Sequence, residues 1–173
     1  GVPDTYQGTE LWDFSLVDPD NRRAVDYDLR ARRLDDSADD EDLLRDWRDG
    51  RIKHRLIARS LQLRRQTPEL FVAGSYRPLR VHGRRADHVL AFAREYAGCA
   101  VVVAVPLRTV ALRDDHAHLS VPPTAWGDTR IELPRALAQR RWTDALGGRT
   151  WAPSLALRVS ELFGRWPLAL LHG

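Results

Sequence analysis

The hydrophobic period of the chain changes at Thr67-Pro68, and this change limits the folds open to it. Between Arg51 and Gln66 the apolar residues recur at the spacing of one helix face, which predicts a helix that Thr67-Pro68 stops. Beyond Pro68 the apolar residues alternate or run continuously, which is typical of antiparallel strands. We therefore expect an α+β chain, with helices in residues 1–68 and an antiparallel, β-sandwich-like domain in residues 69–173.

Turn signals divide the strand-rich half. Ala97-Gly98 predicts a hairpin between two long apolar runs, and Gly147-Gly148 predicts another between Trp142 and Trp151. The expected strands cover residues 76–81, 88–96, 99–107, 130–133 and 166–171.

Capping residues predict further helices. Asp26 favours a helix over residues 26–34, and the acidic stretch that follows favours a short helix over residues 41–47, which Gly50 can end. The apolar pattern of residues 153–164 predicts a short amphipathic helix.

The first segment, Gly1–Tyr27, combines turn formers, carboxylates, paired arginines and aromatic residues with almost no helical period. Val2–Tyr6 predicts a short strand, and Gly8 lets the backbone turn sharply. Asp18-Pro19-Asp20-Asn21 suits a type I turn, because Asp stands first and Pro second. Residues 7–23 are therefore expected to form an ordered loop.

One strand, a loop and helices cannot close a barrel or cover both faces of a sheet. A lone strand has no partner for its backbone hydrogen bonds, and the apolar face of residues 51–66 needs a surface to lie against. That surface is either the strand-rich half or the remainder of a larger α/β domain. The chain begins on Gly1 and contains no methionine, so we expect it to be part of a longer protein.

Composition narrows the function classes only slightly. The chain of 173 residues is 43% hydrophobic and 29% charged, as in globular proteins, with a net charge of only +3. Lys53 is the sole lysine among 27 basic residues, so the bias is toward arginine rather than positive charge. Cys99 is the only cysteine, which excludes an internal disulfide and fits a cytoplasmic protein. The longest apolar run, Cys99–Leu107, is too short to span a membrane.

Several motifs carry a resemblance to a known family. The run Gly1-Val2-Pro3-Asp4-Thr5-Tyr6-Gln7-Gly8-Thr9-Glu10 resembles the last barrel strand of the α-amylase superfamily of glycoside hydrolases. Its continuation is similar to the malto-oligosyltrehalose synthase family in particular. The matching stretches are Ser15–Arg23, Val25–Tyr27, Trp47–Lys53, the LQLRRQTPELF run from Leu61, Ala86–Val89 and Phe92–Arg94.

The resemblance implies a fold and an activity. Residues 1–68 would be the last strand, loop and helices of a (β/α)8 catalytic barrel, and residues 69–173 its C-terminal β-rich domain. The family's enzyme is a (1→4)-α-D-glucan 1-α-D-glucosylmutase, which converts the reducing-end α-1,4 bond of a maltodextrin to an α,α-1,1 bond. It needs no organic cofactor. Its catalytic carboxylates come from earlier strands, so the resemblance implies no catalytic residue here and a chain that is inactive without the N-terminal remainder.

Candidate site residues lie in the first loop. Tyr6 and Trp12 have flat apolar faces suited to stacking on glucose rings, although core packing also explains them. Glu10 either accepts hydrogen bonds from sugar hydroxyls or braces the loop. Donors and acceptors for the hydroxyls of the last two glucose units are offered by Asp18, Asp20, Asn21, Arg22 and Arg23. The alternative is that Arg22 and Arg23 only pair with Asp18 and Asp20.

The sequence also contains a possible metal-ligand pattern and a basic helix face. Asp114, Asp115, His116 and His118 alternate as on an exposed strand, so we expect no metal there. The basic face of residues 51–59 suits phosphates but is more simply a solvated helix face, and we expect no nucleic-acid partner. The competing function is a free-standing β-rich module that binds a starch-like glucan or, as the lesser alternative, nucleic acid.

Overall fold

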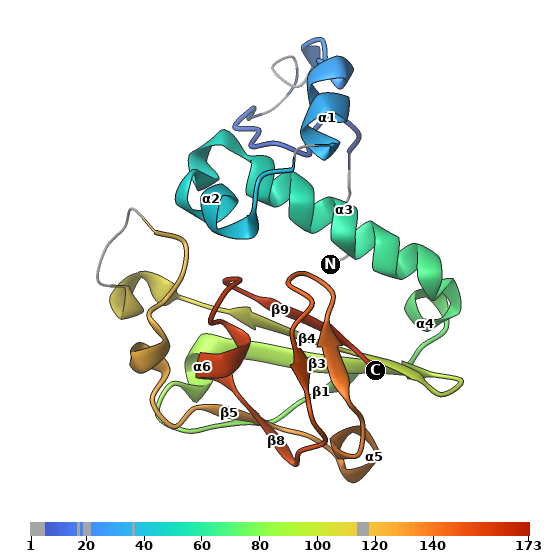
Figure 1. Ribbon diagram of the computed structural model, residues 1–173, viewed down its shortest axis with the longest axis vertical. Coiled ribbons are helices and arrows are strands. Elements are labelled where there is room, and N and C mark those ends of the chain that lie inside the picture. The colour runs from blue at the N-terminus through green and yellow to red at the C-terminus, as the bar shows by residue number, and fades with distance from the viewer. Residues whose placement is uncertain (1–5, 17, 19–21, 36, 114–117) are drawn as a thin grey trace. The chain divides into compact units, whose positions relative to one another are not determined.

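The computed structural model describes residues 6–16, 18, 22–35, 37–113 and 118–173. They fall into two compact units, Gly1–Arg59 and Ser60–Gly173 (Figure 1). The boundary lies inside one continuous helix. Most of the predicted strand Val2–Tyr6, and the turn residues Asp20 and Asn21, lie outside the described residues.

Local signals explain the helices of the first unit. Helix α1 (Tyr27–Leu34) begins after Asp26, whose carboxylate accepts a hydrogen bond from the Leu29 amide at 2.7 Å. Helix α2 (Asp40–Arg45) begins after Asp39, which accepts from the Asp42 amide at 2.9 Å. The predicted helix over residues 26–34 is thus confirmed, whereas that over residues 41–47 begins one residue earlier and ends at Arg45.

The longest helix has the predicted bounds. A 3-10 turn, η2 (Trp47–Asp49), leads to Gly50, which adopts the left-handed φ of 81°. Helix α3 (Arg51–Gln66) starts directly after it. Pro68 then opens a separate short helix, α4 (Pro68–Val72), where its fixed φ and missing amide donor suit the first helical position.

The second unit contains two antiparallel sheets. One has six strands in the order β1-β3-β4-β9-β6-β7, and the other has three in the order β2-β5-β8. The first comprises β1 (Arg77–Pro78), β3 (Val89–Tyr96), β4 (Cys99–Pro106), β9 (Ala169–His172), β6 (Trp142–Asp144) and β7 (Thr150–Trp151). The second comprises β2 (Val81–His82), β5 (Arg130–Glu132) and β8 (Ala156–Arg158). The short helical elements are η3 (Ala86–His88), η4 (Thr109–Leu112), η5 (Pro123–Trp126), α5 (Arg135–Ala138) and α6 (Val159–Leu162).

Both predicted hairpins are present. Strands β3 and β4 pair from Val89↔Pro106 to Tyr96↔Cys99, and the connecting Ala97 and Gly98 both have positive φ, as a two-residue hairpin turn requires. Strands β6 and β7 pair through Trp142↔Trp151.

The two sheets share one core. Val102 of β4 and Leu171 of β9 are buried in the same cluster as Ile131 of β5 and Leu157 of β8. Burial of such side chains, at roughly 1.5–3 kcal/mol each, is the main stabilisation of this unit. The expected mixture of helices with antiparallel sheet is therefore confirmed.

Three predicted elements were wrong in detail. Residues 153–164 form strand β8 and the single turn α6 instead of one helix, because Leu157 pairs with Ile131 across the smaller sheet. Residues 76–81 split into β1 and β2, which join different sheets. Strand β9 starts at Ala169, three residues later than predicted.

No helix within the described ranges is both long enough and apolar enough to cross a membrane. Residues 114–117, which hold most of the metal-ligand pattern weighed above, lie outside those ranges, and the described residues contain no cluster of potential metal ligands.

Candidate functional site

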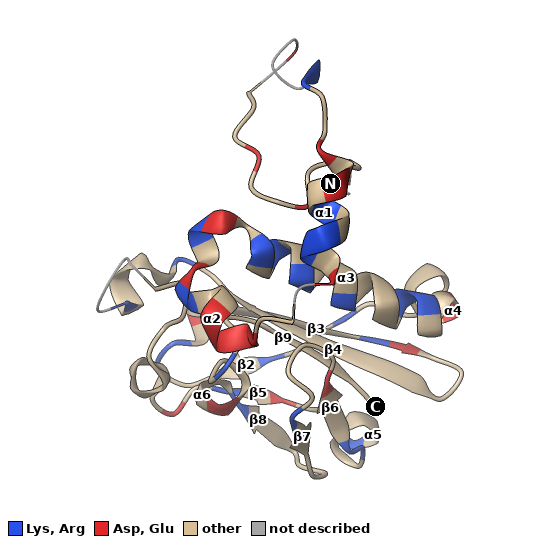
Figure 2. Cartoon of the chain, turned by 45° about the horizontal axis from the view of Figure 1, so that its top comes forward, with Lys and Arg blue, Asp and Glu red and all other residues tan. Residues whose placement is uncertain are grey.

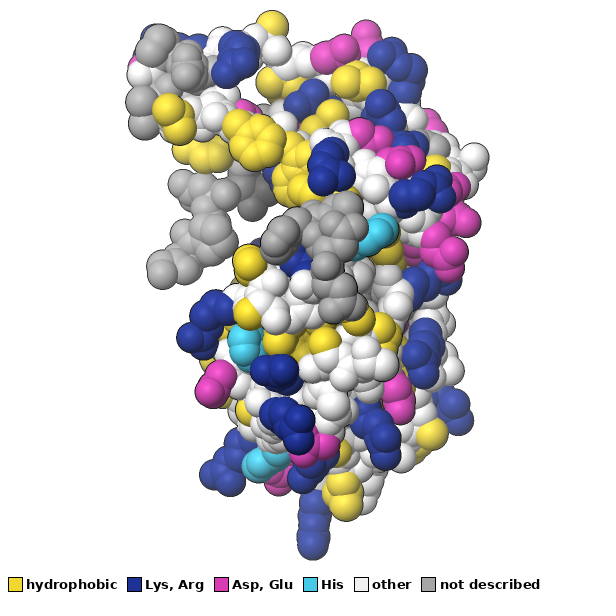
Figure 3. All heavy atoms as spheres, turned by 90° about the vertical axis from the view of Figure 1, so that its left-hand side faces the viewer, with side chains coloured by type: hydrophobic (Ala, Val, Ile, Leu, Met, Phe, Trp, Pro, Cys, Tyr) yellow, Lys and Arg dark blue, Asp and Glu magenta, His cyan; other side chains and the backbone are white. Residues whose placement is uncertain are grey.

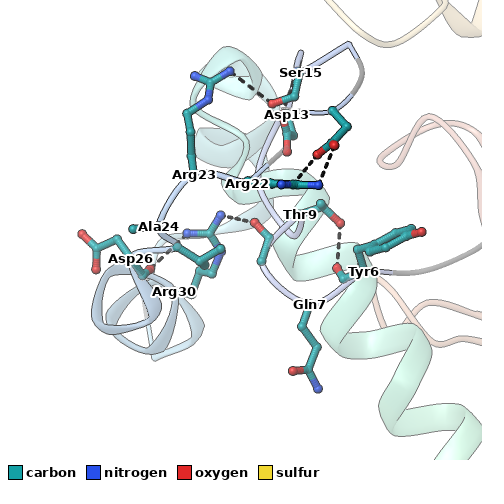
Figure 4. A pocket seen from close by; sticks show the side chains of 13 residues that line it. Tyr6, Gln7, Thr9, Asp13, Ser15, Arg22, Arg23, Ala24, Asp26 and Arg30 are labelled. Carbon is teal, nitrogen blue, oxygen red and sulfur yellow. Dashed lines mark hydrogen bonds and ion pairs between the residues drawn. The ribbon is translucent and has the colours of Figure 1, made fainter. Parts of the chain in front are cut away.

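A cavity of about 600 Å³ lies in the first unit, between the loop and the start of α1 (Figure 4). Its lining combines guanidinium groups, carboxylates and hydroxyls. The lining residues are Tyr6, Gln7, Gly8, Thr9, Asp13, Ser15, Asp18, Arg22, Arg23, Ala24, Val25, Asp26 and Arg30.

The cavity exists because the chain folds back closely on itself at Gly8. Gly8 has a φ of +96°, and a Cβ atom placed there would lie 2.6 Å from a methyl group of Val25. Only glycine permits both the left-handed conformation and this approach. Asp26 follows Val25 and caps α1. The end of the loop therefore leads directly into α1, which closes one side of the cavity.

Arg30 holds the two ends of the loop together. Its guanidinium donates to Oε2 of Glu10 at 2.9 Å, to the carbonyl of Asp26 at 3.0 Å and to the carbonyl of Gly8. The side chains of Arg30 and Glu10 are only 18% and 24% exposed. Pairs with this degree of burial and this many hydrogen bonds are worth more than surface ion pairs.

Glu10 is directed into the loop itself. It accepts from the Gly8 amide at 3.0 Å as well as from Arg30. Partial burial raises the pKa of this carboxyl, but the hydrogen bonds from the Gly8 amide and Arg30 together hold it below its ordinary value. Glu10 is therefore a charged brace in this structure.

Arg22 and Asp18 form a bidentate pair at the cavity, with Nε–Oδ1 and Nη2–Oδ2 distances of 2.5 and 2.7 Å. Their side chains are 74% and 55% exposed. An exposed ion pair contributes about 0–1 kcal/mol, so it does not hold the loop in place. A ligand hydroxyl can replace either partner at small cost.

Neighbouring polar groups continue this surface. Arg23 donates to the Ser15 hydroxyl at 3.2 Å, and the Ser15 amide donates to Asp13 at 2.8 Å (Figure 4). Hydrogen bonding from Ser15 lowers the pKa of Asp13. Donors and ionised acceptors thus alternate along the wall.

Trp12 lies outside the cavity lining, against the segment that precedes α3. Its indole nitrogen donates to the Trp47 carbonyl at 2.7 Å, and the two rings meet edge to face at 6.3 Å. Trp12 as a whole residue remains 37% exposed. Other apolar side chains of the loop are more exposed, with Tyr6 at 68% and Phe14 at 87%. Hydrophobic side chains reach the molecular surface beside cationic side chains in Figure 3.

The structure brings four of the eight predicted site residues together, namely Tyr6, Asp18, Arg22 and Arg23. Glu10 and Trp12 lie outside the cavity lining, and Asp20 and Asn21 are outside the described residues. Contact of any of them with sugar stays a prediction. Sequence reasoning missed Arg30, although Asp26 as helix cap places it one turn along α1.

Basic residues recur along α3 (Figure 2), and those of the first unit have internal partners. Arg51 pairs with Asp49 at 2.6 Å. Arg55 and Arg59 both reach Asp40, which is buried, at 3.3 and 2.8 Å. These cations connect α3 to α2, through Asp40, and to the 3-10 turn η2, through Asp49.

His54, on the same helix, gives a testable dependence on pH. The residue is 7% exposed, and burial lowers its pKa; Glu10 opposes this shift and Arg30 adds to it. At pH values between the folded-state pKa of His54 and its ordinary value near 6.5, the unfolded chain binds more protons than the folded chain. The unfolding free energy should therefore fall as the pH drops below about 6.5. The loss approaches about 1.4 kcal/mol for each unit of pKa difference.

Chemical denaturation of the wild type and of His54→Gln near pH 7.5 and near pH 5.5 measures this dependence. We expect the wild type to lose more stability than the variant over this interval. Equal losses would mean that His54 does not titrate differently in the folded state.

No protein-family model matches the chain. Two curated relatives, from the CDC 1551 / Oshkosh and ATCC 25618 / H37Rv strains of Mycobacterium tuberculosis, are each described as "Putative maltooligosyl trehalose synthase". Each is 42% identical over 174 residues, a match that covers 99% of this chain and 18% of the relative.

Solved structures give the same result. A point mutant of maltooligosyltrehalose synthase from Arthrobacter ramosus matches with a TM-score of 0.72 and 35% identity, over 99% of this chain and 20% of that one. A second maltooligosyl trehalose synthase matches with a TM-score of 0.65 and 25% identity, over 99% and 19%. The chain thus spans about a fifth of the length of the relatives it matches. Over almost its whole length, the chain is similar to the C-terminal portion of maltooligosyl trehalose synthases.

Proposed function

We propose that this chain serves as the C-terminal part of a maltooligosyl trehalose synthase, a (1→4)-α-D-glucan 1-α-D-glucosylmutase that acts on maltodextrins. In this proposal residues 1–68 complete a (β/α)8 barrel whose catalytic carboxylates lie in the remainder of the enzyme. Residues 69–173 form its C-terminal β-rich domain. The chain contributes sugar binding and no catalytic residue.

The observation that carries this proposal is the exposed Asp18–Arg22 pair at a cavity of about 600 Å³ whose lining is partly polar and partly apolar. Ligand pockets of roughly 300–1,000 Å³ suit small molecules of a few rings. A sugar ring presents hydroxyls that both donate and accept, so it matches a wall on which guanidinium and carboxylate groups alternate. The similarity to maltooligosyl trehalose synthases supplies the sugar class.

The reaction explains why such a wall is needed. A carboxylate nucleophile displaces the reducing-end glucose from C1 of the next unit, while a carboxylic acid protonates the departing O4. The anomeric hydroxyl of the released glucose then attacks the glycosyl-enzyme, gives its proton to the same acid/base residue and forms the α,α-1,1 bond. Glucose must stay bound and turn during this interval, or water hydrolyses the intermediate. We assign this retention to Asp18 and Arg22, with Tyr6 and Arg23 beside them.

Replacement of Arg22 by alanine in the complete enzyme tests the assignment. Loss of a charge-assisted hydrogen bond, worth about 1.5 kcal/mol or more, should raise the ratio of hydrolysis to isomerisation roughly tenfold. The ratio is measured as free glucose against trehalose-ended product from maltopentaose. The chain of 173 residues alone should give neither product.

Arg32→Ala is the matched control, since Arg32 is an exposed arginine on α1 outside the cavity lining. It should leave the product ratio unchanged. An unchanged ratio in Arg22→Ala as well would assign Arg22 to loop structure alone. Conversion of maltopentaose by the isolated chain would refute the absence of catalytic residues.

A further inference from the structure

Trp12 is fixed from a part of the chain more than thirty residues away. Its indole nitrogen donates to the Trp47 carbonyl at 2.7 Å. Lys53, on the first turns of α3, donates from Nζ to the carbonyls of Thr9 at 2.6 Å and Leu11 at 2.8 Å. The same ammonium lies 5.5 Å from the centre of the Trp12 ring. Two contacts therefore hold the ring directly, and two hydrogen bonds from Lys53 hold the backbone before it.

Gly50 makes these contacts geometrically possible. It has a φ of +81°, and a Cβ atom there would lie 2.9 Å from the Trp12 amide nitrogen and 3.2 Å from Cα of Leu11. The loop thus touches the backbone at the start of α3 directly. This close approach brings the carbonyls of Thr9 and Leu11 within reach of the Lys53 ammonium.

The identity of Lys53 is informative because every other cation among the 27 basic residues is arginine. An ammonium is a compact point charge with three donors, whereas a guanidinium is a larger planar group whose donors are fixed in one plane. The carbonyls of Thr9 and Leu11 converge on this one compact ammonium. The Lys53 side chain is partly buried, so its charge is also less screened than a surface charge.

We propose that Lys53 is a positioning residue that holds Trp12 ready to stack on a pyranose ring of the glucan. This inference rests on the proposed function. A flexible tryptophan loses rotamer freedom when it binds a ligand, and a ring that is already fixed avoids that loss. The 37% of Trp12 that remains exposed is then available for the sugar.

The first test uses the chain itself and measures water exchange of the Trp12 indole proton by nuclear magnetic resonance. Lys53→Met should speed this exchange at least severalfold, because the bond to the Trp47 carbonyl opens more often. The indole proton of Trp142, which is buried and bonded to the Leu137 carbonyl, reports the fold of the second unit. The amide proton of Leu43, which is buried and bonded to the Asp39 carbonyl, reports the fold of the first. Both should exchange as before. The Trp12→Phe variant identifies the Trp12 resonance. Unchanged Trp12 exchange, or equal acceleration at the Leu43 amide of the same unit, would overturn the proposal.

The second test is a double-mutant cycle in the complete enzyme with maltopentaose. Trp12→Ala should raise KM roughly three- to tenfold, through the loss of one stacking contact. Lys53→Met should raise KM about twofold or more in the wild-type background and leave it unchanged when Trp12 is already alanine. Arg65→Met, at an exposed basic residue on the same helix, is the control and should not change KM.

The cycle separates the two hypotheses. If Trp12→Ala raises KM but Lys53→Met acts equally in both backgrounds, or not at all, the positioning role is refuted while sugar stacking stands. If Trp12→Ala has no effect on KM, stacking by Trp12 is refuted, and the positioning role is refuted with it.

Discussion

Replacement of Arg30 by methionine is expected to lower the unfolding free energy of the first unit by about 2–3 kcal/mol. The change removes the donors to the carbonyls of Gly8 and Asp26 and leaves the Glu10 carboxylate partly buried without its cation. A fully buried pair would cost more, but side-chain exposures of 18% and 24% reduce the penalty through solvent screening. Chemical denaturation measures the effect.

The matched control for this prediction is Arg22→Met. It deletes an arginine of the same loop that makes a shorter, bidentate ion pair, yet its pair with Asp18 is largely exposed. The expected loss is below about 1 kcal/mol. Equal losses in the two variants would mean that burial does not distinguish the two pairs, and Arg30 would then not be the brace of the cavity.

The second large effect is expected for Asp40→Asn. The Asp40 side chain is 6% exposed and is shared by Arg55 and Arg59, whose side chains are 17% and 28% exposed. The variant keeps the shape of the side chain but removes the negative charge between two cations. We expect a loss of about 3 kcal/mol of unfolding free energy, at the low end of the range for breaking a buried ion pair.

Asp42→Asn controls for charge at the same helix end. Asp42 also lies in the first turn of α2, and its partner is Arg45, but its side chain is 48% exposed. Loss of its interaction with the helix dipole and with Arg45 should cost about 1 kcal/mol or less. The two variants can be compared by denaturant titration. A loss at Asp40 no greater than that at Asp42 would contradict the structural role of the shared carboxylate.

Elements set by neighbouring residues could be predicted from the sequence. Helix α3 has its predicted bounds because Gly50 and Pro68 stand beside its ends, and the β3–β4 hairpin follows from Ala97-Gly98. Strand β8 could not be found in this way. Its pairing with β5 joins residues that are far apart in the sequence, such as Ile131 and Leu157, and that pairing overrides the helical pattern of residues 153–164.

In the candidate site, too, features set by neighbouring residues could be predicted and those set by distant residues could not. The residues of the first loop were recognised together because they are adjacent in sequence. Arg30 and Lys53 were not, because each acts from a helix on carbonyl groups of the loop, and backbone acceptors leave no trace in the side-chain pattern. The pairing of Arg22 with Asp18 is local, so the sequence offered it as one of two alternatives.

The boundary between the two compact units inside α3 bears on how this chain can be recombined with related proteins. A chimera joined between Arg59 and Ser60 would combine side chains of two parents within one 16-residue helix. Side-chain pairs three and four residues apart across the junction would then no longer be those of either parent. A crossover placed after Gln66 keeps the helix intact, and Pro68 then begins the exchanged segment with its own helix start. A crossover at the proline is therefore expected to disturb fewer native side-chain contacts than one at the boundary that compactness alone suggests.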